Sequence, residues 1–110
     1  SDRLKDASLT IILKEQISSE TKNSEKLNTL VGELAQGQAL IHQKKFAQAE
    51  QILQKQAREF PDVAVIRDLL GNALYLNGRS KEALEVYLKA EALDPNNKAR
   101  KVIINKIKGQ

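Results

Sequence analysis

Apolar residues recur along this chain at helical spacing, and polar or turn-forming residues interrupt them. Between about Arg3 and Ile17 the apolar residues cover a wide helical face, made of Leu4, Ala7, Leu9, Ile11, Ile12, Leu13 and Ile17. The polar stretch 18–23 then predicts a loop or hinge, and Ser24 is placed to cap the next helix. No run of β-branched residues alternates as a strand would. The pattern predicts helices alone.

Five further helices follow from the same periodicity, over about residues 25–43, 46–60, 65–76, 81–93 and 97–108. Pro61 and Pro95 end two of them, because proline cannot continue the hydrogen-bond ladder. The sequence 77–79, Asn-Gly-Arg, predicts a tight turn, and Ser80 is the expected N-cap of the helix that follows. The chain is therefore expected to be all-α, with about six helices.

Two stretches of the chain repeat each other at an offset of 34 residues. The matched pairs are Gly37 with Gly71, Ala39 with Ala73, Leu40 with Leu74, Ala49 with Ala83, and Pro61 with Pro95. A fixed period of this length indicates stacked supersecondary units. Such stacks form extended concave surfaces that hold other proteins.

The second repeated unit, residues 64–97, resembles the tetratricopeptide repeat, a 34-residue helix–turn–helix. The matching residues are Leu70, Gly71, Leu74, Gly78, Ala83, Tyr87, Ala90, Leu93 and Pro95. The first unit, residues 30–63, matches less completely, at Gly37, Leu40, Ala49, Leu53 and Pro61. Glu33 and Gln36 stand where the family favours large apolar residues, and Lys44-Lys45 replaces the usual glycine-containing turn.

The resemblance implies a short right-handed α-solenoid of antiparallel helix–turn–helix repeats. We expect one domain over 1–110, in which 1–23 is an extra N-terminal helix and hinge, 24–63 and 64–97 are the repeats, and 98–110 is a capping helix. Two repeats bury little core by themselves, so the flanking helices are expected to complete it. In the last helix, Val102, Ile103 and Ile107 are expected to seal the second repeat.

The resemblance also implies a ligand groove lined by the first helix of each repeat. Its positions in this chain are Val31, Leu34, Gln38, Ile41, Val65, Asp68, Asn72 and Tyr75. Asn72 offers a donor and an acceptor, and Tyr75 a flat apolar body with a polar tip, which suits an extended peptide.

Val31, Leu34 and Ile41 make an apolar stripe where a solvated groove would be polar. Either the chain's own first helix covers this stripe, or a partner helix does, or a second copy exchanges its first helix. We therefore expect a protein-binding scaffold or adaptor domain. The alternative is a self-association module, such as a homodimer, that uses the N-terminal helix.

The net charge of +4 is concentrated at the C-terminus. Residues 98–110 carry five basic residues and no acidic one, whereas 1–97 carry 13 basic and 14 acidic residues. This tail has no aromatic residue to stack on a base, as nucleic-acid modules usually have. Binding to RNA or to a membrane surface through the tail is the less favoured alternative.

The sequence offers little for catalysis. It has no cysteine and a single histidine, His42, so thiolate metal sites and disulfides are excluded and no cofactor is expected. We expect no enzyme. No apolar run is long enough to span a bilayer, and a soluble cytoplasmic or periplasmic domain is expected. The lack of methionine suggests a piece of a longer protein, for example a membrane-anchored one, and the glutamine- and lysine-rich helices suggest a bacterial one.

Overall fold

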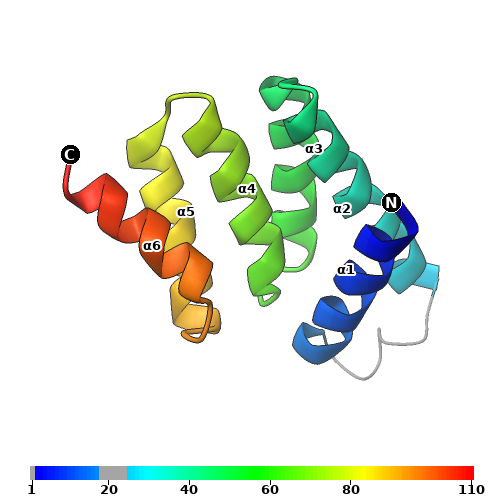
Figure 1. Ribbon diagram of the computed structural model, residues 1–110. Coiled ribbons are helices and arrows are strands. Elements are labelled where there is room, and N and C mark those ends of the chain that lie inside the picture. The colour runs from blue at the N-terminus through cyan, green and yellow to red at the C-terminus, as the bar shows by residue number, and fades with distance from the viewer. Residues whose placement is uncertain (1, 18–24) are drawn as a thin grey trace.

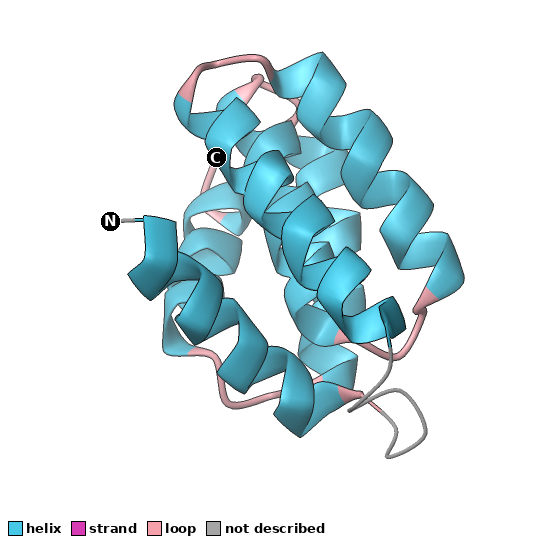
Figure 2. Ribbon diagram, turned by 90° about the vertical axis from the view of Figure 1, so that its right-hand side faces the viewer, coloured by secondary structure: helices cyan, strands magenta, loops and turns pink. Residues whose placement is uncertain are grey.

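All the elements in the described part of the chain are helices. The computed structural model describes residues 2–17 and 25–110. Its helices are α1 (Asp2–Gln16), α2 (Glu25–His42), α3 (Phe46–Glu59), α4 (Ala64–Leu76), α5 (Ser80–Leu93) and α6 (Lys98–Lys108). Short loops join the helices from α2 to α6 (Figure 2). The expectation of an all-α helical repeat is confirmed. The hinge expected at 18–23 and the cap expected at Ser24 lie outside the described residues.

The helices stack as two antiparallel pairs with one further helix at each end. α2 packs against α3, and α4 packs against α5, while α3 and α4 join the two pairs. α1 contacts α2 and the neighbouring part of α4, and α6 contacts α5 (Figure 1). None of the described helices combines the length and apolarity needed to cross a bilayer. The stack leaves α2, α4 and α6 along one face of the molecule.

Two glycines allow the paired helices to approach closely. A Cβ atom added at Gly71 would lie 2.5 Å from Cε1 of Tyr87, and one added at Gly37 would lie 3.1 Å from Cδ2 of Leu53. Both distances are shorter than ordinary carbon–carbon contact. Tyr87 is only 1% exposed, and its burial, together with the negative charge of Asp68, raises the pKa of Tyr87. The side chains of Leu53 and Tyr87 therefore explain why the repeat has glycine at positions 37 and 71.

The two turns inside the pairs share an unusual backbone conformation. Gly78 has φ of 80°, and Lys44, which precedes it by 34 residues, has φ of 63°. Glycine adopts this left-handed conformation freely, whereas a residue with a Cβ is strained in it. The first repeat therefore has the same turn conformation as the second, but with lysine in place of the favoured glycine.

The start of α5 differs from the sequence-based prediction. Ser80 is already the first residue of the helix, and Arg79 occupies the N-cap position without a side-chain capping bond. The backbone N–H of Ala83 donates to the carbonyl of Arg79, so helical bonding begins one residue earlier than expected. Ser80 as N-cap was therefore wrong. The Arg79 side chain instead binds Glu82 and reaches Glu50 of α3 at 2.6 Å.

A polar pair replaces part of the expected apolar packing in the first repeat. Gln56 of α3 is 3% exposed and donates a hydrogen bond to the Glu33 carboxylate of α2. A buried amide costs free energy unless it is hydrogen-bonded, so Glu33 supports Gln56 at this position. Gln36 is exposed.

The C-terminal helix seals the stack with two of the three expected residues, Ile103 and Ile107, but not with Val102. Ile104 and Ile107 are buried and Ile103 is partly buried, but Val102 is 56% exposed. The prediction that Val102 seals the second repeat was wrong. Arg100, one helical turn before Ile104, occupies the buried face instead and is 2% exposed.

Candidate functional site

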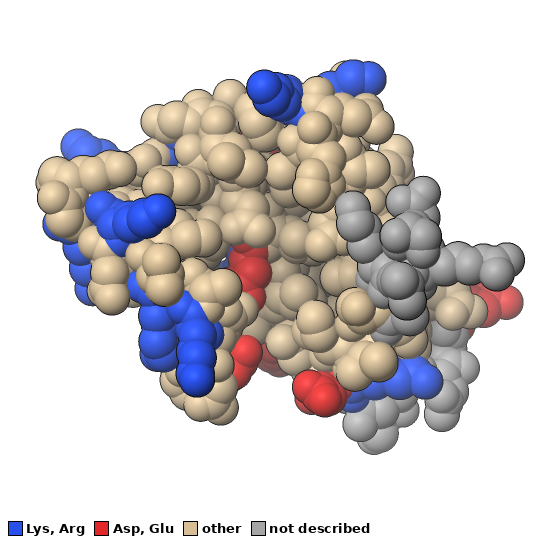
Figure 3. Space-filling view, in the orientation of Figure 1, with Lys and Arg blue, Asp and Glu red and all other residues tan. Residues whose placement is uncertain are grey.

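A hollow of about 300 Å³ lies between α2, α4 and α6. Its lining residues are Gln38, Ile41 and His42 from α2, Leu69, Asn72, Tyr75 and Leu76 from α4, and Ile103 from α6. Figure 3 views the hollow face on, with basic side chains gathered over α6 at its left. The repeat explains the arrangement, because Gln38 and Asn72, like Ile41 and Tyr75, are 34 residues apart and so occupy equivalent places on adjacent helices.

Four of the eight predicted groove residues meet in this hollow. They are Gln38, Ile41, Asn72 and Tyr75. Sequence reasoning missed four more lining residues, which are His42, Leu69, Leu76 and Ile103. Three of these lie four positions after a predicted residue and so on the same side of the helix: His42 after Gln38, Leu69 after Val65 and Leu76 after Asn72. Helical spacing could therefore have found them.

The other four predicted residues lie outside the lining of the hollow. Leu34 is fully buried, in the same core cluster as Leu9 and Leu13 of α1, and Val31 packs against that cluster. Val65 is 9% exposed at the start of α4. Asp68 forms an ion pair with Arg100 of α6. The stripe on α2 is thus divided, because Leu34 is enclosed in the core while Ile41 lines the hollow.

α1 contributes a side-chain cap to the start of α4. Gln16 Oε1 accepts a hydrogen bond of 2.8 Å from the backbone N–H of Val65. This N–H belongs to the first turn of α4, where backbone N–H groups have no acceptor inside their own helix. The end of α1 is therefore held against α4 by a directional bond as well as by apolar packing.

The polar groups of the hollow differ in how they are satisfied. Asn72 Oδ1 accepts a hydrogen bond of 2.6 Å from the hydroxyl of Tyr87, which fixes the orientation of the amide. Gln38 Oε1 is buried and has no hydrogen-bond partner in the described part of the chain. A buried acceptor without a donor costs free energy, so this oxygen is suited to a donor from a ligand or from water.

Asp68 holds α6 in place through Arg100. The Nε and Nη2 atoms of Arg100 lie 2.6 and 3.0 Å from the two Asp68 oxygens, and Nη1 lies 2.8 Å from Glu91 Oε1. Nη1 also donates to the carbonyl of Asp94. Burial opposes the charge, but the bonds to Asp68 and Glu91 outweigh it and raise the pKa of Arg100.

Asn97 joins the same network at the start of α6. Its Oδ1 accepts from the backbone N–H of Arg100 at 2.9 Å and its Nδ2 donates to Asp68 at 3.2 Å. The side chain is therefore both the cap of α6 and a link to α4. Because Ile103 lies on this anchored helix, the network also fixes one wall of the hollow.

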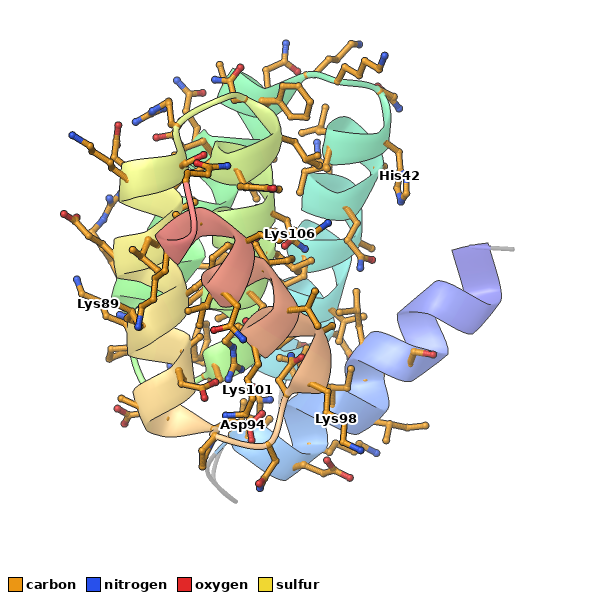
Figure 4. The ribbon with its side chains drawn as sticks, turned by 60° about the vertical axis from the view of Figure 1, so that its left-hand side comes forward. His42, Lys89, Asp94, Lys98, Lys101 and Lys106 are labelled. Atoms are coloured by element: carbon orange, nitrogen blue, oxygen red, sulfur yellow. The ribbon has the colours of Figure 1, made fainter. Side chains whose placement is uncertain are left out.

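The basic residues of α6 fall into two groups. Arg100 and Lys101 form ion pairs, the latter with Glu91. Lys98, Lys106 and Lys108 are exposed and form no ion pair with any described residue. Figure 4 shows Lys98, Lys101 and Lys106 spaced along α6, and His42 at the end of α2. Part of the basic charge of this helix is thus used for folding.

The sequence comparisons agree with this architecture. A profile described as Tetratricopeptide repeat matches residues 37–102, which is more than half of the chain and runs from α2 into α6. No curated protein and no solved structure matches the chain significantly. The matched span contains both close helix crossings, at Gly37 and at Gly71. With this match and these helix pairs, the chain belongs to the tetratricopeptide repeat family.

Proposed function

We propose that this chain is a protein-interaction domain that holds an extended segment of a partner protein in the hollow between α2, α4 and α6. Tetratricopeptide repeats generally mediate protein–protein interactions. The observation that carries the proposal is Gln38, which lines an otherwise mainly apolar hollow and whose buried Oε1 has no donor among the described residues.

The polar groups suit a peptide backbone. Gln38 Oε1 can accept from a backbone N–H, and the Nδ2 atom of Asn72, whose Oδ1 is engaged by Tyr87, can donate to a carbonyl. Each peptide unit of an extended segment exposes one such donor and one such acceptor. A helix interior has already paired these groups within itself, so an extended segment fits better than a partner helix.

The apolar groups suit a side chain of that segment. Ile41, Tyr75 and Leu76 flank the two polar groups, and Leu76 is 56% exposed in the free chain. Covering them with an apolar side chain removes this surface from water and contributes about 25 cal/mol per Å² buried. The backbone contacts orient the segment, and the apolar contact supplies most of its affinity.

A second candidate function is self-association through α1. Ile11 is 62% exposed and Ile12 is 36% exposed, and adjacent exposed isoleucines favour contact with another surface. Light scattering of the chain and of an Ile11→Ser, Ile12→Ser variant tests this candidate. A particle mass that stays monomeric at every concentration in both proteins eliminates it.

Peptides selected from a random display library on the full chain provide a test of groove binding. We expect Leu76→Ser to weaken their binding by about tenfold, because it removes roughly two buried methylene equivalents of contact. Leu88→Ser is the matched control, since Leu88 is also exposed, at 42%, but lies on α5 away from the lining of the hollow. Equal losses in the two variants would contradict groove binding.

Gln38→Met tests the polar contact separately. Methionine has nearly the same length but no strong acceptor, so we expect binding to weaken by about threefold to tenfold. The melting temperature is expected to stay the same or rise, because the variant loses a buried acceptor that has no donor in the described part of the chain. Unchanged binding would remove Gln38 from the proposed site.

A further inference from the structure

We propose that the partner segment carries acidic residues beside its apolar side chain and that Lys98 and Lys106 of α6 bind them. This inference rests on the proposed function and specifies the chemistry of its partner. It follows from the faces of α6 and from the distribution of charge around the hollow.

The faces of α6 place these lysines beside the hollow. Arg100, Ile104 and Ile107 form its buried face, and Ile103 lines the hollow. Lys106 follows Ile103 by one helical turn, so the two side chains are neighbours on the helix surface. Lys98, Val102 and Lys106 are spaced by four residues and form one exposed row along α6, which begins at Lys98 and ends at this neighbour of Ile103.

The charges around the hollow make this row the site for an anion. No carboxylate is among the described residues that line the hollow. Asp68, which precedes the lining residue Leu69 on α4, is bound through both oxygens to Arg100. Lys98 and Lys106 have no ion pair with the described residues, whereas Arg100 and Lys101 do. Glu91 and Asp94, the other described carboxylates in contact with α6, are likewise paired with Arg100 or Lys101. The two lysines of the row therefore remain for carboxylates on a partner.

A peptide fits this surface better than a nucleic acid does. Sites for single-stranded nucleic acids combine a basic groove with aromatic side chains that stack on successive bases. α6 has no aromatic residue, and the exposed member of its row between the lysines is Val102, at 56% exposure. An aliphatic residue between two cations offers a nucleobase no stacking surface, so the row suits carboxylates on a peptide better than bases.

Three synthetic peptides test the inference directly. Each has the same central leucine in the same neutral sequence, flanked on both sides by glutamate, glutamine or lysine. We expect the full chain to bind the glutamate peptide about tenfold more tightly than the glutamine peptide, since each exposed ion pair contributes at most about 1 kcal/mol. The lysine peptide is expected to bind more weakly than either. Raising the salt concentration from about 0.05 M to about 0.5 M should remove most of the difference.

Charge reversal in the chain identifies the residues responsible. Lys98→Glu with Lys106→Glu should cancel or reverse the preference for the glutamate peptide and leave binding of the glutamine peptide nearly unchanged. The matched control is Lys81→Glu with Lys89→Glu, at two exposed lysines of α5. Figure 4 shows Lys89 on the side of α5 away from α6. The control should keep the preference. If the charge reversal lowers the melting temperature, Lys98→Gln with Lys106→Gln is the milder variant to use. It should abolish the preference for the glutamate peptide.

The outcomes separate this inference from the proposed function. If all three peptides bind equally and Leu76→Ser weakens each of them, the groove binds peptides and the acidic preference is wrong. If none of the three binds and library selection also fails, the proposed function itself is wrong. If a single-stranded RNA or a vesicle with acidic lipids binds more tightly than the glutamate peptide, and loses binding in the α6 reversal, the row serves that ligand and the inference is overturned.

Discussion

The hydroxyl of Tyr87 donates a hydrogen bond of 2.6 Å to Asn72 Oδ1, which connects the packed interior of the second repeat to the wall of the hollow. The ring of Tyr87 fills the space that Gly71 leaves open, and its hydroxyl ends at Asn72. Asn72 therefore supports the core through its Oδ1 while it also lines the hollow.

The first prediction is that Asn72→Ala destabilises the fold. It leaves the Tyr87 hydroxyl without its acceptor, and we expect a loss of about 1–2 kcal/mol in the free energy of unfolding. Tyr87→Phe in the same background should cost less than it does in the wild-type chain, because the hydroxyl has then already lost its partner. Urea unfolding of the two single variants and the double variant measures this coupling. Strict additivity would show that the bond contributes nothing.

The second prediction concerns the close approach of α4 and α5. Gly71→Ala should destabilise the chain by about 1–3 kcal/mol, since its Cβ would overlap the Tyr87 ring. Gly32→Ala is the matched control in α2, where an added Cβ meets nothing within 4 Å. That control should stabilise by about 0.5–1 kcal/mol through helix propensity. Thermal unfolding of both variants decides the point, and a stabilising Gly71→Ala would contradict the packing described for Tyr87.

The third prediction concerns the strained turn of the first repeat. Lys44→Gly should stabilise the chain by up to about 1 kcal/mol, because φ of 63° costs a lysine more than a glycine. Lys55→Gly, at an exposed position inside α3, should instead destabilise by about 1 kcal/mol. Chemical unfolding of the two variants measures both changes. Destabilisation by Lys44→Gly would mean that Lys44 makes a contribution beyond its backbone conformation.

The fourth prediction is that acid weakens the link between α5 and α6. Hydrogen bonds from Lys101 and then Arg100 hold the pKa of Glu91 below its ordinary value. The folded chain therefore binds fewer protons there than the unfolded chain does. This stabilisation is present above the ordinary glutamate pKa and is lost as the pH falls through the lowered one.

Unfolding by urea between about pH 7 and about pH 3 measures the effect of this glutamate. Glu91→Gln should be less stable than the wild-type chain at neutral pH, and its stability should fall less steeply with acidification. Glu85→Gln is the control, because Glu85 is an exposed residue of the same helix with no ion pair to the described residues. An equally steep fall in Glu91→Gln would exclude Glu91 as a source of the acid sensitivity.

Much of the fold could be predicted because the relevant signals are local or periodic. Pro61 and Pro95 each follow a helix within two residues of its end, and Gly78 occupies a turn with positive φ. The 34-residue offset then identifies Gly37 and Gly71 as equivalent positions. These signals depend on residue type and spacing alone, so they can be read without coordinates.

The site was only partly predictable because its remaining features depend on long-range contacts. Asp68 looks like a free groove residue until Arg100, 32 positions later, is seen to bind it. Val65 looks available until Gln16 reaches its backbone N–H from α1. Neither contact has a local sequence signal, since each depends on how a flanking helix docks.

The most direct test of the central claim is to map a bound peptide on the chain by NMR. Titration of a library-selected peptide into the uniformly ¹⁵N-labelled full chain reports which backbone amides change their chemical shift. We predict the largest changes around Gln38, Asn72, Leu76 and Ile103, from the three helices that line the hollow. Changes confined to α3 and α5, on the other side of the stack, would contradict binding in the hollow.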